Sequence, residues 1–345
     1  MKKLIKFIII VSLIAGIYYV YSTYTKKENV ELPKIINKKE DKKLQIFDEN
    51  SNERMIAVMI NNNHAAWPHA GLDKSVINYE ILAEGGVTRI MAIYKGNLPE
   101  KIGSIRSSRH YYLDYALEND AIYVHWGGSP FAYSDIDKFN IDNIDAMYSY
   151  KYFYRDTTLN KAYEHTGFSK GSLLKSAIEN NEIRSTSNEK MLFKYSKDEI
   201  IFNDKNSIKA DNIEINYSGY QISSYEYDKN NKVYLRSMSN EKHVDAVTGK
   251  QYTAKNIIIY KLPFNVLDSK GRIEISNIGS GEGYFITNGY AKEITWEKTS
   301  RKSQTIYRYK DNNEEIILND GNTWIQIMPE NKYLGITSNN DNIKE

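Results

Sequence analysis

The sequence predicts an α/β domain with a mainly parallel sheet, joined to a smaller β-rich antiparallel domain and preceded by an N-terminal transmembrane helix. Three observations support this fold class. One apolar stretch of about 20 residues, long enough to span a bilayer, stands at the N-terminus. Between residues 51 and 189, short apolar strands alternate with helical patterns. From 190 to 330, short strands follow one another with turn residues between them.

Residues 1–25 have the features of an uncleaved signal-anchor. Lysines precede the apolar run, and four tyrosines lie at its far end, as in the aromatic belt of a membrane interface. No small-residue cleavage pattern follows. The stretch "LIAG" (13–16) resembles the start of a lipobox, but Ile17 stands where the lipidated cysteine would be, and the chain has no cysteine. We expect a single-pass helix in the cell membrane and an extracytoplasmic body.

The remaining boundaries follow from changes in composition. Residues 26–50 are polar, lysine-rich and aperiodic, which favours a flexible tether. We place the α/β domain at 51–189, the β-rich domain at 190–330 and a disordered, asparagine-rich tail at 331–345.

Within the α/β domain, strands and helices are predicted from the spacing of apolar residues. The continuous apolar runs that indicate buried strands lie at 55–60, 87–96 and 121–129. The helical patterns lie at 73–86, after the motif "RSSR" at 106–109, and at 170–182. The first of these helices closes on two glycines, which are typical of a helix C-terminus.

Three further segments have distinctive patterns. Residues 225–238 alternate around an Asn-Asn turn and predict a hairpin. The glycine-rich "GSGEG" (279–283) is interpreted as a turn, because no helix follows it to form a phosphate loop. In 147–156, alternating tyrosines would share one strand face, which suits either stacking on sugars or a protein partner, or else a half-buried strand.

Composition excludes several classes of function. The chain has 46 basic and 44 acidic residues, so a nucleic-acid partner is not expected. Without cysteine there are no disulfides, thiol nucleophiles or thiolate metal sites. The histidines lack a metal-ligand spacing such as H-E-x-x-H, and we therefore expect neither a metal nor a cofactor.

The arginine pair Arg106 and Arg109 is the first candidate site. Both lie at a predicted helix start, where the helix dipole disfavours positive charge. If Ser107 or Ser108 caps the helix, backbone N–H groups and two guanidinium groups converge on a site for phosphate or carboxylate. The alternative is an internal salt bridge, and its candidate partners are Glu80, Glu84 and Asp114.

Polar clusters follow the predicted strands at 61–63, 106–109 and 125–129, and ligands bind beyond the carboxyl ends of parallel strands. In the last cluster, His125 is a candidate base or hydrogen-bond donor. Gly127 and Gly128 would let the backbone approach a ligand. Ser129 precedes a proline outside any G-x-S-x-G motif, so it is a poor candidate nucleophile, and a plain strand-to-helix turn explains the segment equally well.

The chain resembles the YerB-like family of bacterial extracytoplasmic lipoproteins over about 55–330. The segments that resemble its N-terminal domain are "NNNHAAWPHAGLDKSVINYEILAEGGVTRIMAIY", "GSIRSSRHYYLDYA" and "HWGGSP". Those that resemble its C-terminal domain are "VDAVTGKQYTAKNIIIY", "GRIEISNIGSGEGYFITNG" and "GNTWIQIMP". The resemblance implies a surface location, a two-domain body and a Gram-positive-type origin, but no established activity.

Carried over residue by residue, the family's motif positions are Asn61, Pro68, Glu84, Arg89, Arg106, Ser107, Arg109, Gly127, Gly128 and His165. Two departures stand out: the lipidated cysteine is absent, and Thr166 follows His165 where asparagine is expected. The combined ligand-binding prediction is Asn61, Glu84, Arg89, Arg106, Ser107, Arg109, His125, Gly127, Gly128, Ser129 and His165.

We expect a cell-envelope protein that binds an anionic or carbohydrate ligand, such as a wall polymer, or an envelope partner protein. An enzyme acting on wall polymers or their lipid-phosphate precursors is the alternative, with Glu84, His125 or Asp156 as acid or base. The alternative predicts a deep cleft that holds a carboxylate or an imidazole within reach of the arginines.

Overall fold

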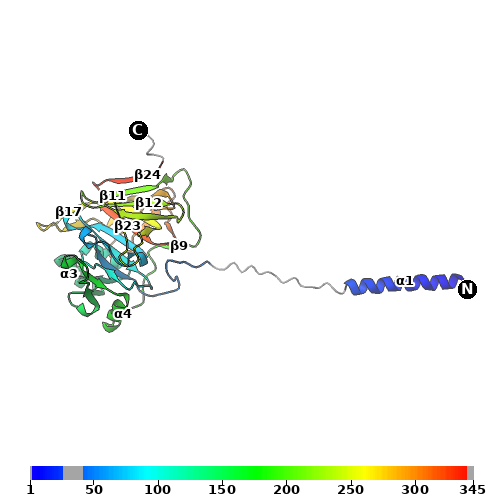
Figure 1. Ribbon diagram of the computed structural model, residues 1–345. Coiled ribbons are helices and arrows are strands. Elements are labelled where there is room, and N and C mark those ends of the chain that lie inside the picture. The colour runs from blue at the N-terminus through cyan, green and yellow to red at the C-terminus, as the bar shows by residue number, and fades with distance from the viewer. Residues whose placement is uncertain (1, 26–41, 340–345) are drawn as a thin grey trace. The chain divides into compact units, whose positions relative to one another are not determined.

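The structure is a computed structural model that describes residues 2–25 and 42–339 (Figure 1). The N-terminal residues form one helix, α1 (Lys2–Thr25), and from Lys43 the chain forms a separate compact body. Within α1, the 18-residue window Phe7–Tyr24 is long and apolar enough to cross a membrane.

The predicted tether at 26–50 is only partly described, because residues 26–41 lie outside the described residues. Its last part belongs to the body. The backbone N–H groups of Gln45 and Ile46 donate to the Asp320 carboxylate at 2.7 and 3.0 Å, and Phe47 packs against the core. The body therefore begins several residues earlier than the composition predicts.

One large sheet runs through the body. In spatial order its strands are β10 (Ile208–Lys209), β20 (Tyr290–Lys298), β19 (Gly279–Thr287), β16 (Asn256–Leu262), β23 (Thr323–Pro329), β2 (Ile77–Leu82), β3 (Thr88–Tyr94), β1 (Ile56–Asn61), β5 (Ile122–His125) and β6 (Asn143–Asp145), with β21 (Ile306–Tyr309) beside β20. Strands from both halves of the sequence contribute to it, and β2 and β23 meet as parallel neighbours in the middle.

A second, antiparallel sheet contains β14 (Glu241–Lys242), β13 (Val233–Met238), β12 (Ile222–Asp228), β11 (Asn212–Asn216) and β24 (Leu334–Thr337), with β15 (Thr253–Ala254) beside β13. The small sheets are β17 (Phe264–Val266) with β18 (Ile273–Ile275), β9 (Lys194–Ser196) with β22 (Ile317–Asn319), and β4 (Ile102–Gly103), β8 (Gly167–Ser169) and β7 (Phe153–Arg155). The helices of the body are α2 (His110–Glu118), α3 (Pro130–Phe139) and α4 (Gly171–Asn180).

The large sheet is covered on both faces, which explains its continuous apolar strands. In β1, Ala57 and Met59 face a core shared with α2 and α3. Their neighbours Val58 and Ile60 face a core shared with α4 and the second sheet. Figure 1 shows α3 and α4 at one end of the body and β24 at the other.

The prediction of a mainly parallel sheet is confirmed only in part, since the large sheet is mixed. β3 lies between β1 and β2 and is antiparallel to both, whereas β5 and β6 continue β1 in parallel. The cause is the short connection from β2 to β3. Gly85 and Gly86, with φ of 73° and 74°, turn the chain back within a few residues, and a parallel crossover needs a dozen or more.

The predicted helix at 73–86 is wrong, because its central part, Ile77–Leu82, is the strand β2, and short 3-10 turns flank it. Its residues alternate across the sheet: Ile77, Tyr79 and Ile81 face one core. Asn78 and Glu80 point to the other side and are completely buried. Ile77, Tyr79 and Ile81 have the period of two that is typical of a strand. The neighbouring apolar residues Val76 and Leu82 interrupt this alternation, which is why the sequence pattern misleads here.

The tyrosine-rich segment 147–156 does not form a single strand with one tyrosine face. Tyr148 is exposed, Tyr152 is buried within a 3-10 turn, and only Phe153–Arg155 form a strand, β7. The "GSGEG" segment is the beginning of β19 and not a turn. The predicted disordered tail at 331–345 contains β24, which pairs with β11, and residues 340–345 lie outside the described residues.

Other predicted elements are found as expected. The strands at 55–60, 87–96 and 121–129 correspond to β1, β3 and β5. The helix at 170–182 is α4, and the hairpin at 225–238 is β12 and β13. Local sequence patterns predict the element correctly where the spacing of apolar residues fits a helix or a strand alone.

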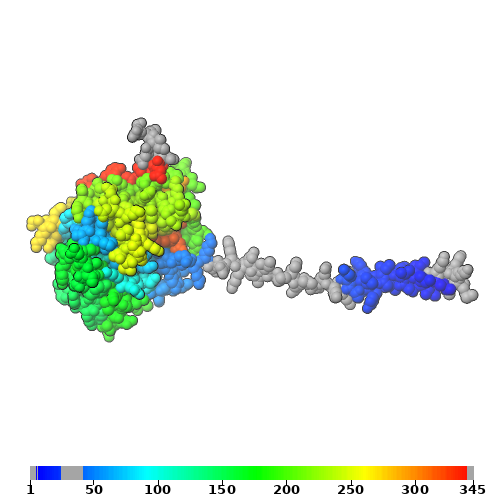
Figure 2. All heavy atoms as spheres, in the orientation of Figure 1, coloured from blue at the N-terminus to red at the C-terminus, as the bar shows by residue number. Residues whose placement is uncertain are grey.

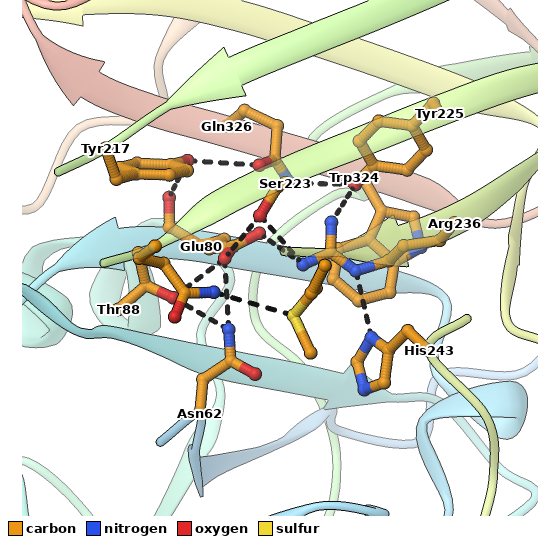
Figure 3. A network of polar contacts seen from close by, with 12 residues as sticks. Asn62, Glu80, Thr88, Tyr217, Ser223, Tyr225, Arg236, His243, Trp324 and Gln326 are labelled. Atoms are coloured by element: carbon orange, nitrogen blue, oxygen red, sulfur yellow. Dashed lines mark hydrogen bonds and ion pairs between the residues drawn. The ribbon is translucent and has the colours of Figure 1, made fainter. Parts of the chain in front are cut away.

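A buried ion pair joins the large sheet to the second sheet (Figure 3). Arg236 on β13 donates through Nη2 to Glu80 Oε2 on β2 at 2.7 Å, and both side chains are 0% exposed. Buried charge is costly unless it is paired and fully hydrogen-bonded. Here Glu80 Oε1 also accepts from Thr88, Asn62 and Ser223, at 2.7, 3.1 and 3.0 Å.

The arginine side of this pair is equally well satisfied. Arg236 Nη1 donates to the Tyr225 hydroxyl at 2.6 Å, and Nε donates to His243 Nδ1 at 3.0 Å. Its Cζ lies 4.2 Å from the centre of the Trp324 ring. The network thus contains residues of both halves of the chain, and it should make their association specific.

We predict that Arg236→Leu destabilises the body by about 3–5 kcal/mol, because it leaves the Glu80 carboxylate buried without its cation. Urea unfolding of the full-length chain in detergent measures this change. The double variant Glu80→Gln/Arg236→Leu should recover part of the loss, since no charge then remains. A loss below about 1 kcal/mol for the single variant would show that the pair contributes little.

Candidate functional site

A pocket of about 460 Å³ lies where β1 ends and the antiparallel strand β3 begins. Its lining brings together residues that are far apart in the sequence: Asn61, Asn63, Glu84, Gly85, Val87, Arg89, Arg106, Arg109, His165, Lys270 and Arg272. Six of these belong to the predicted ligand-binding set, namely Asn61, Glu84, Arg89, Arg106, Arg109 and His165. The predicted arginine pair and the predicted strand-end cluster are therefore parts of one cavity.

The pairing of β1, β2 and β3 fixes the positions of Asn61, Arg89 and Glu84 in the pocket. Asn61, the last residue of β1, is paired with Arg89 on β3, and Arg89 is paired on its other side with Ile81 of β2. Glu84 lies in the turn between β2 and β3, so the tight glycine turn holds its carboxylate beside Arg89.

The segment 104–109 brings in the arginine pair. It runs beside β1, where Arg106 N donates to Met59 O at 2.9 Å and Asn61 N donates to Ser104 O at 2.9 Å. The expected serine cap of α2 is wrong: Arg109 itself is the N-cap residue, and its side chain does not cap the helix. Ser107 instead accepts hydrogen bonds from Arg89 and Arg109.

Glu84 is the internal salt-bridge partner of one arginine of the predicted pair, Arg109. Its Oε1 accepts from Arg109 Nε at 2.5 Å, and its Oε2 lies 3.7 Å from Arg89 Nη2. Burial would raise the pKa of Glu84, but the hydrogen bond and charge of Arg109 and the charge of Arg89 outweigh it and lower the pKa. Glu84 is therefore an ionised carboxylate, and Arg109 is paired within the protein.

Arg106 has no such partner. Among residues 42–339, its one side-chain hydrogen bond runs from Nη1 to the carbonyl oxygen of Glu164, at 3.3 Å. In the same residues it forms no ion pair within 4.0 Å. Burial, and then the charges of Arg109 and Arg155, lower its pKa, with Glu164 opposing them. An arginine is charged at every physiological pH, so an anion would stabilise this partly desolvated guanidinium.

His165 completes the inner side of the pocket. Its Nδ1 accepts from Asn61 Nδ2 at 2.8 Å, which assigns the ring proton to Nε2. Burial lowers its pKa, and Arg106 and Lys161 lower it further, against the effect of Glu164. The imidazole is thus neutral at pH 7 and offers one N–H donor.

Two imidazoles, those of His243 and His69, connect Asn61 of the pocket to the buried ion pair through hydrogen bonds. His243 Nδ1 accepts from Arg236, so His243 Nε2 carries the proton and donates to His69 Nδ1 at 2.6 Å. His69 Nε2 then donates to the carbonyl oxygen of Asn61 at 2.6 Å. Burial lowers the pKa of His69 to about 3 and that of His243 well below its usual value, so both rings are neutral.

The remaining five predicted residues do not line the pocket: they are Ser107, His125, Gly127, Gly128 and Ser129. His125 is completely buried, with Nδ1 at 2.9 Å from the Gly127 carbonyl oxygen and Nε2 at 3.2 Å from Asn143 Oδ1. Ser129 caps α3 by accepting from Ala132 N. This loop is a strand-to-helix turn, and it supports segment 104–109 through the bond from Ser108 N to Gly127 O at 2.8 Å.

Two basic residues of the pocket were missed by the sequence analysis. Lys270 and Arg272 lie on the β17–β18 hairpin, a protruding element of the body (Figures 1 and 2). Arg272 is paired with Asp268 at 2.8 Å, and Lys270 is exposed. The turn "DSKGRIE" contains them, but no sequence signal indicates that it returns to the N-terminal half.

The pocket therefore carries five basic side chains and one acidic side chain. Of these, Arg109 and Arg89 share Glu84, and Arg272 is paired outside the pocket. The excess positive charge and the N–H groups suit a phosphate or a carboxylate. Among the described residues, no group of three or more His, Asp or Glu side chains could hold a metal ion.

Comparison with known proteins shows the family to which the chain belongs. Two profiles of one family, described as the N-terminal and C-terminal domains of a protein of unknown function (DUF3048), match residues 44–184 and 213–325. The chain belongs to this family.

One relative is the protein named "Putative lipoprotein YerB" of Bacillus subtilis (strain 168). It is 28% identical over 284 residues, which cover 80% of this chain and 82% of the relative. The crystal structure of YerB from Bacillus subtilis matches with a TM-score of 0.71 at 25% identity, covering 82% of this chain and 94% of that chain. The resemblance seen in the sequence motifs is thereby confirmed.

We predict that Glu84→Gln destabilises the body by about 1.5–3 kcal/mol at pH 7, the range for hydrogen bonds to charged groups. The pKa of Glu84 is lowered on folding, so its contribution is complete above the ordinary glutamate pKa of about 4.3 and is lost as the pH falls below that value. The difference between wild type and variant should therefore shrink from pH 7 to pH 3.

Urea unfolding at both pH values measures this difference. Glu214→Gln, at an exposed position on β11, is the matched control and should show no difference at either pH. A Glu84→Gln effect that stays the same at pH 3 would contradict the assigned charge state.

Proposed function

We propose that this is a membrane-anchored, extracytoplasmic envelope protein whose pocket binds the phosphate or carboxylate group of an envelope ligand. The observation that carries the proposal is the unpaired guanidinium of Arg106, half-buried beside the neutral His165 and the exposed Lys270. A charged donor in a partly desolvated site gains most from a ligand that supplies the missing anion.

The location follows from the anchor and the relative. YerB is described as a lipoprotein, which implies attachment to the outer side of a membrane. This chain cannot carry a thioether-linked lipid, because it has no cysteine. The apolar helix α1 offers the alternative anchor, and the lysines at its N-terminus support a single pass with the body outside.

Binding is favoured over catalysis because the candidate acids and bases are already engaged. Glu84 is held by Arg109 and Arg89. His125 is buried away from the pocket, and Asp156 is paired with Lys101 at 2.6 Å. The pocket does contain an imidazole, His165, but its Nδ1 is occupied by Asn61, which leaves it as a hydrogen-bond donor.

We predict that Arg106→Ala lowers the affinity for inorganic phosphate by about tenfold or more, because a charge-assisted hydrogen bond is worth about 1.5–3 kcal/mol. Isothermal titration calorimetry on the full-length chain in non-ionic detergent measures this affinity. Arg308→Ala, on the distant strand β21, is the matched control and should bind like wild type.

Measuring the stability of the two variants tells whether Arg106 contributes to ligand binding or to the stability of the fold. Arg106→Ala should unfold at the same urea concentration as wild type. If wild type binds no phosphate, or if Arg106→Ala loses stability and keeps its affinity, the pocket is not an anion site.

We predict that trypsin added to intact cells releases the body into the supernatant, because the lysine-rich stretch between α1 and the body lies outside the cell. Immunoblotting of cells and supernatant detects the release. A cytosolic protein serves as the control and should stay intact until the cells are lysed. A body that remains cell-associated and intact, or that fractionates with the cytosol, would contradict this location.

A further inference from the structure

The pocket is adjacent to a stack of a guanidinium between two aromatic rings. The Cζ atom of Arg155, on β7, lies 3.8 Å from the centre of the Trp126 ring and 4.1 Å from the centre of the Tyr163 ring. Arg155 Nη1 also donates to the carbonyl oxygen of Tyr163 at 2.6 Å. The stack therefore holds Tyr163 in one orientation.

One short turn connects the stack to the pocket. Tyr163, Glu164 and His165 form a single 3-10 turn. Tyr163 belongs to the stack, His165 lines the pocket, and the Glu164 carbonyl oxygen between them accepts from Arg106. Arg106 is therefore bonded to the residue that directly follows Tyr163, and Tyr163 itself lies outside the lining of the pocket.

The Tyr163 ring is prepared for stacking. It is 69% exposed although Arg155 covers one of its faces. A ring that is already held in place loses little conformational entropy when a ligand packs on it. Aromatic side chains of this kind combine a large apolar face with a polar tip.

Arg155 extends the positive charge of the pocket toward this ring. Among residues 42–339 it makes no ion pair within 4.0 Å, and its charge is close enough to lower the pKa of Arg106. The cavity, at about 460 Å³, lies in the range of sites for small organic molecules, which runs from about 300 to 1,000 Å³. A phosphate ion alone would leave most of it empty.

We infer that the ligand is an anionic saccharide, whose phosphate or carboxylate group binds at Arg106 while its sugar ring stacks on Tyr163. This inference rests on the proposed function and specifies the ligand of the same pocket. The apolar face of a pyranose ring matches a flat aromatic ring beside a basic site. A phosphoserine or phosphothreonine group would supply the anion but no ring of its own to pack on Tyr163.

Titration calorimetry on the full-length chain in non-ionic detergent tests the inference with five probes: inorganic phosphate, glycerol 3-phosphate, N-acetylglucosamine 1-phosphate, glucuronic acid and a phosphoserine peptide. We expect at least one of the two saccharides to bind tenfold or more tightly than inorganic phosphate and glycerol 3-phosphate. The stronger of the two tells whether the anion is a phosphate or a carboxylate.

Tyr163→Ala should abolish the advantage of the saccharide and leave the affinity for inorganic phosphate unchanged. Tyr163→Phe should keep the advantage, because the ring remains. Tyr333→Ala, at a tyrosine that is 59% exposed and lies next to β24, is the matched control and should behave like wild type.

The outcomes separate the two proposals. If inorganic phosphate binds through Arg106 but the saccharides gain nothing over it, or Tyr163→Ala changes nothing, the saccharide inference is overturned and the anion site stands. Tighter binding of the phosphoserine peptide than of either saccharide would overturn it in favour of a protein partner. If none of the probes binds to wild type, both proposals fall.

Discussion

The ion pair between Glu80 and Arg236 is the constraint on which the rest of the body depends. Glu80 lies on β2, at the centre of the large sheet, and Arg236 lies on β13 of the sheet packed over it. Neither charge reaches water, so the structure must bring both halves of the chain together before either charge is compensated. The parallel pairing of β2 with β23 beside this pair makes the two family domains share one sheet.

The same network leads to the pocket. Arg236 fixes the tautomer of His243, His243 fixes that of His69, and His69 donates to Asn61. The Asn61 side chain in turn fixes His165. The first step starts from the buried, charged guanidinium of Arg236, and the later steps are hydrogen bonds between buried neutral rings or amides. The orientation of a pocket residue is therefore coupled to the contact between the sheets. A pocket built on such a rigid base is suited to recognising one ligand geometry.

The charged residues of the pocket fall into a group that is paired within the protein and a group that is not. Glu84 compensates Arg109 and Arg89, and these three groups hold the β2–β3 turn against the start of α2. Arg106 and Lys270 remain without a carboxylate in the described part of the chain. A fully compensated pocket would have no reason to attract an anion, and a fully uncompensated one would destabilise the fold.

The sequence by itself determined the apolar helix α1, the strands β1, β3 and β5 and the helix α4, since each has a local signature. It also indicated six residues of the pocket, of which Arg89 and His165 came from the family resemblance alone. The tertiary structure alone decided that residues 77–82 form the strand β2, because its polar face is buried against a partner, Arg236, that lies 156 positions from Glu80. It also decided that Arg109 is paired and Arg106 is not, and that Lys270 and Arg155 lie beside them. Side-chain pairing depends on distances across the fold, and local periodicity contains no information about such distances.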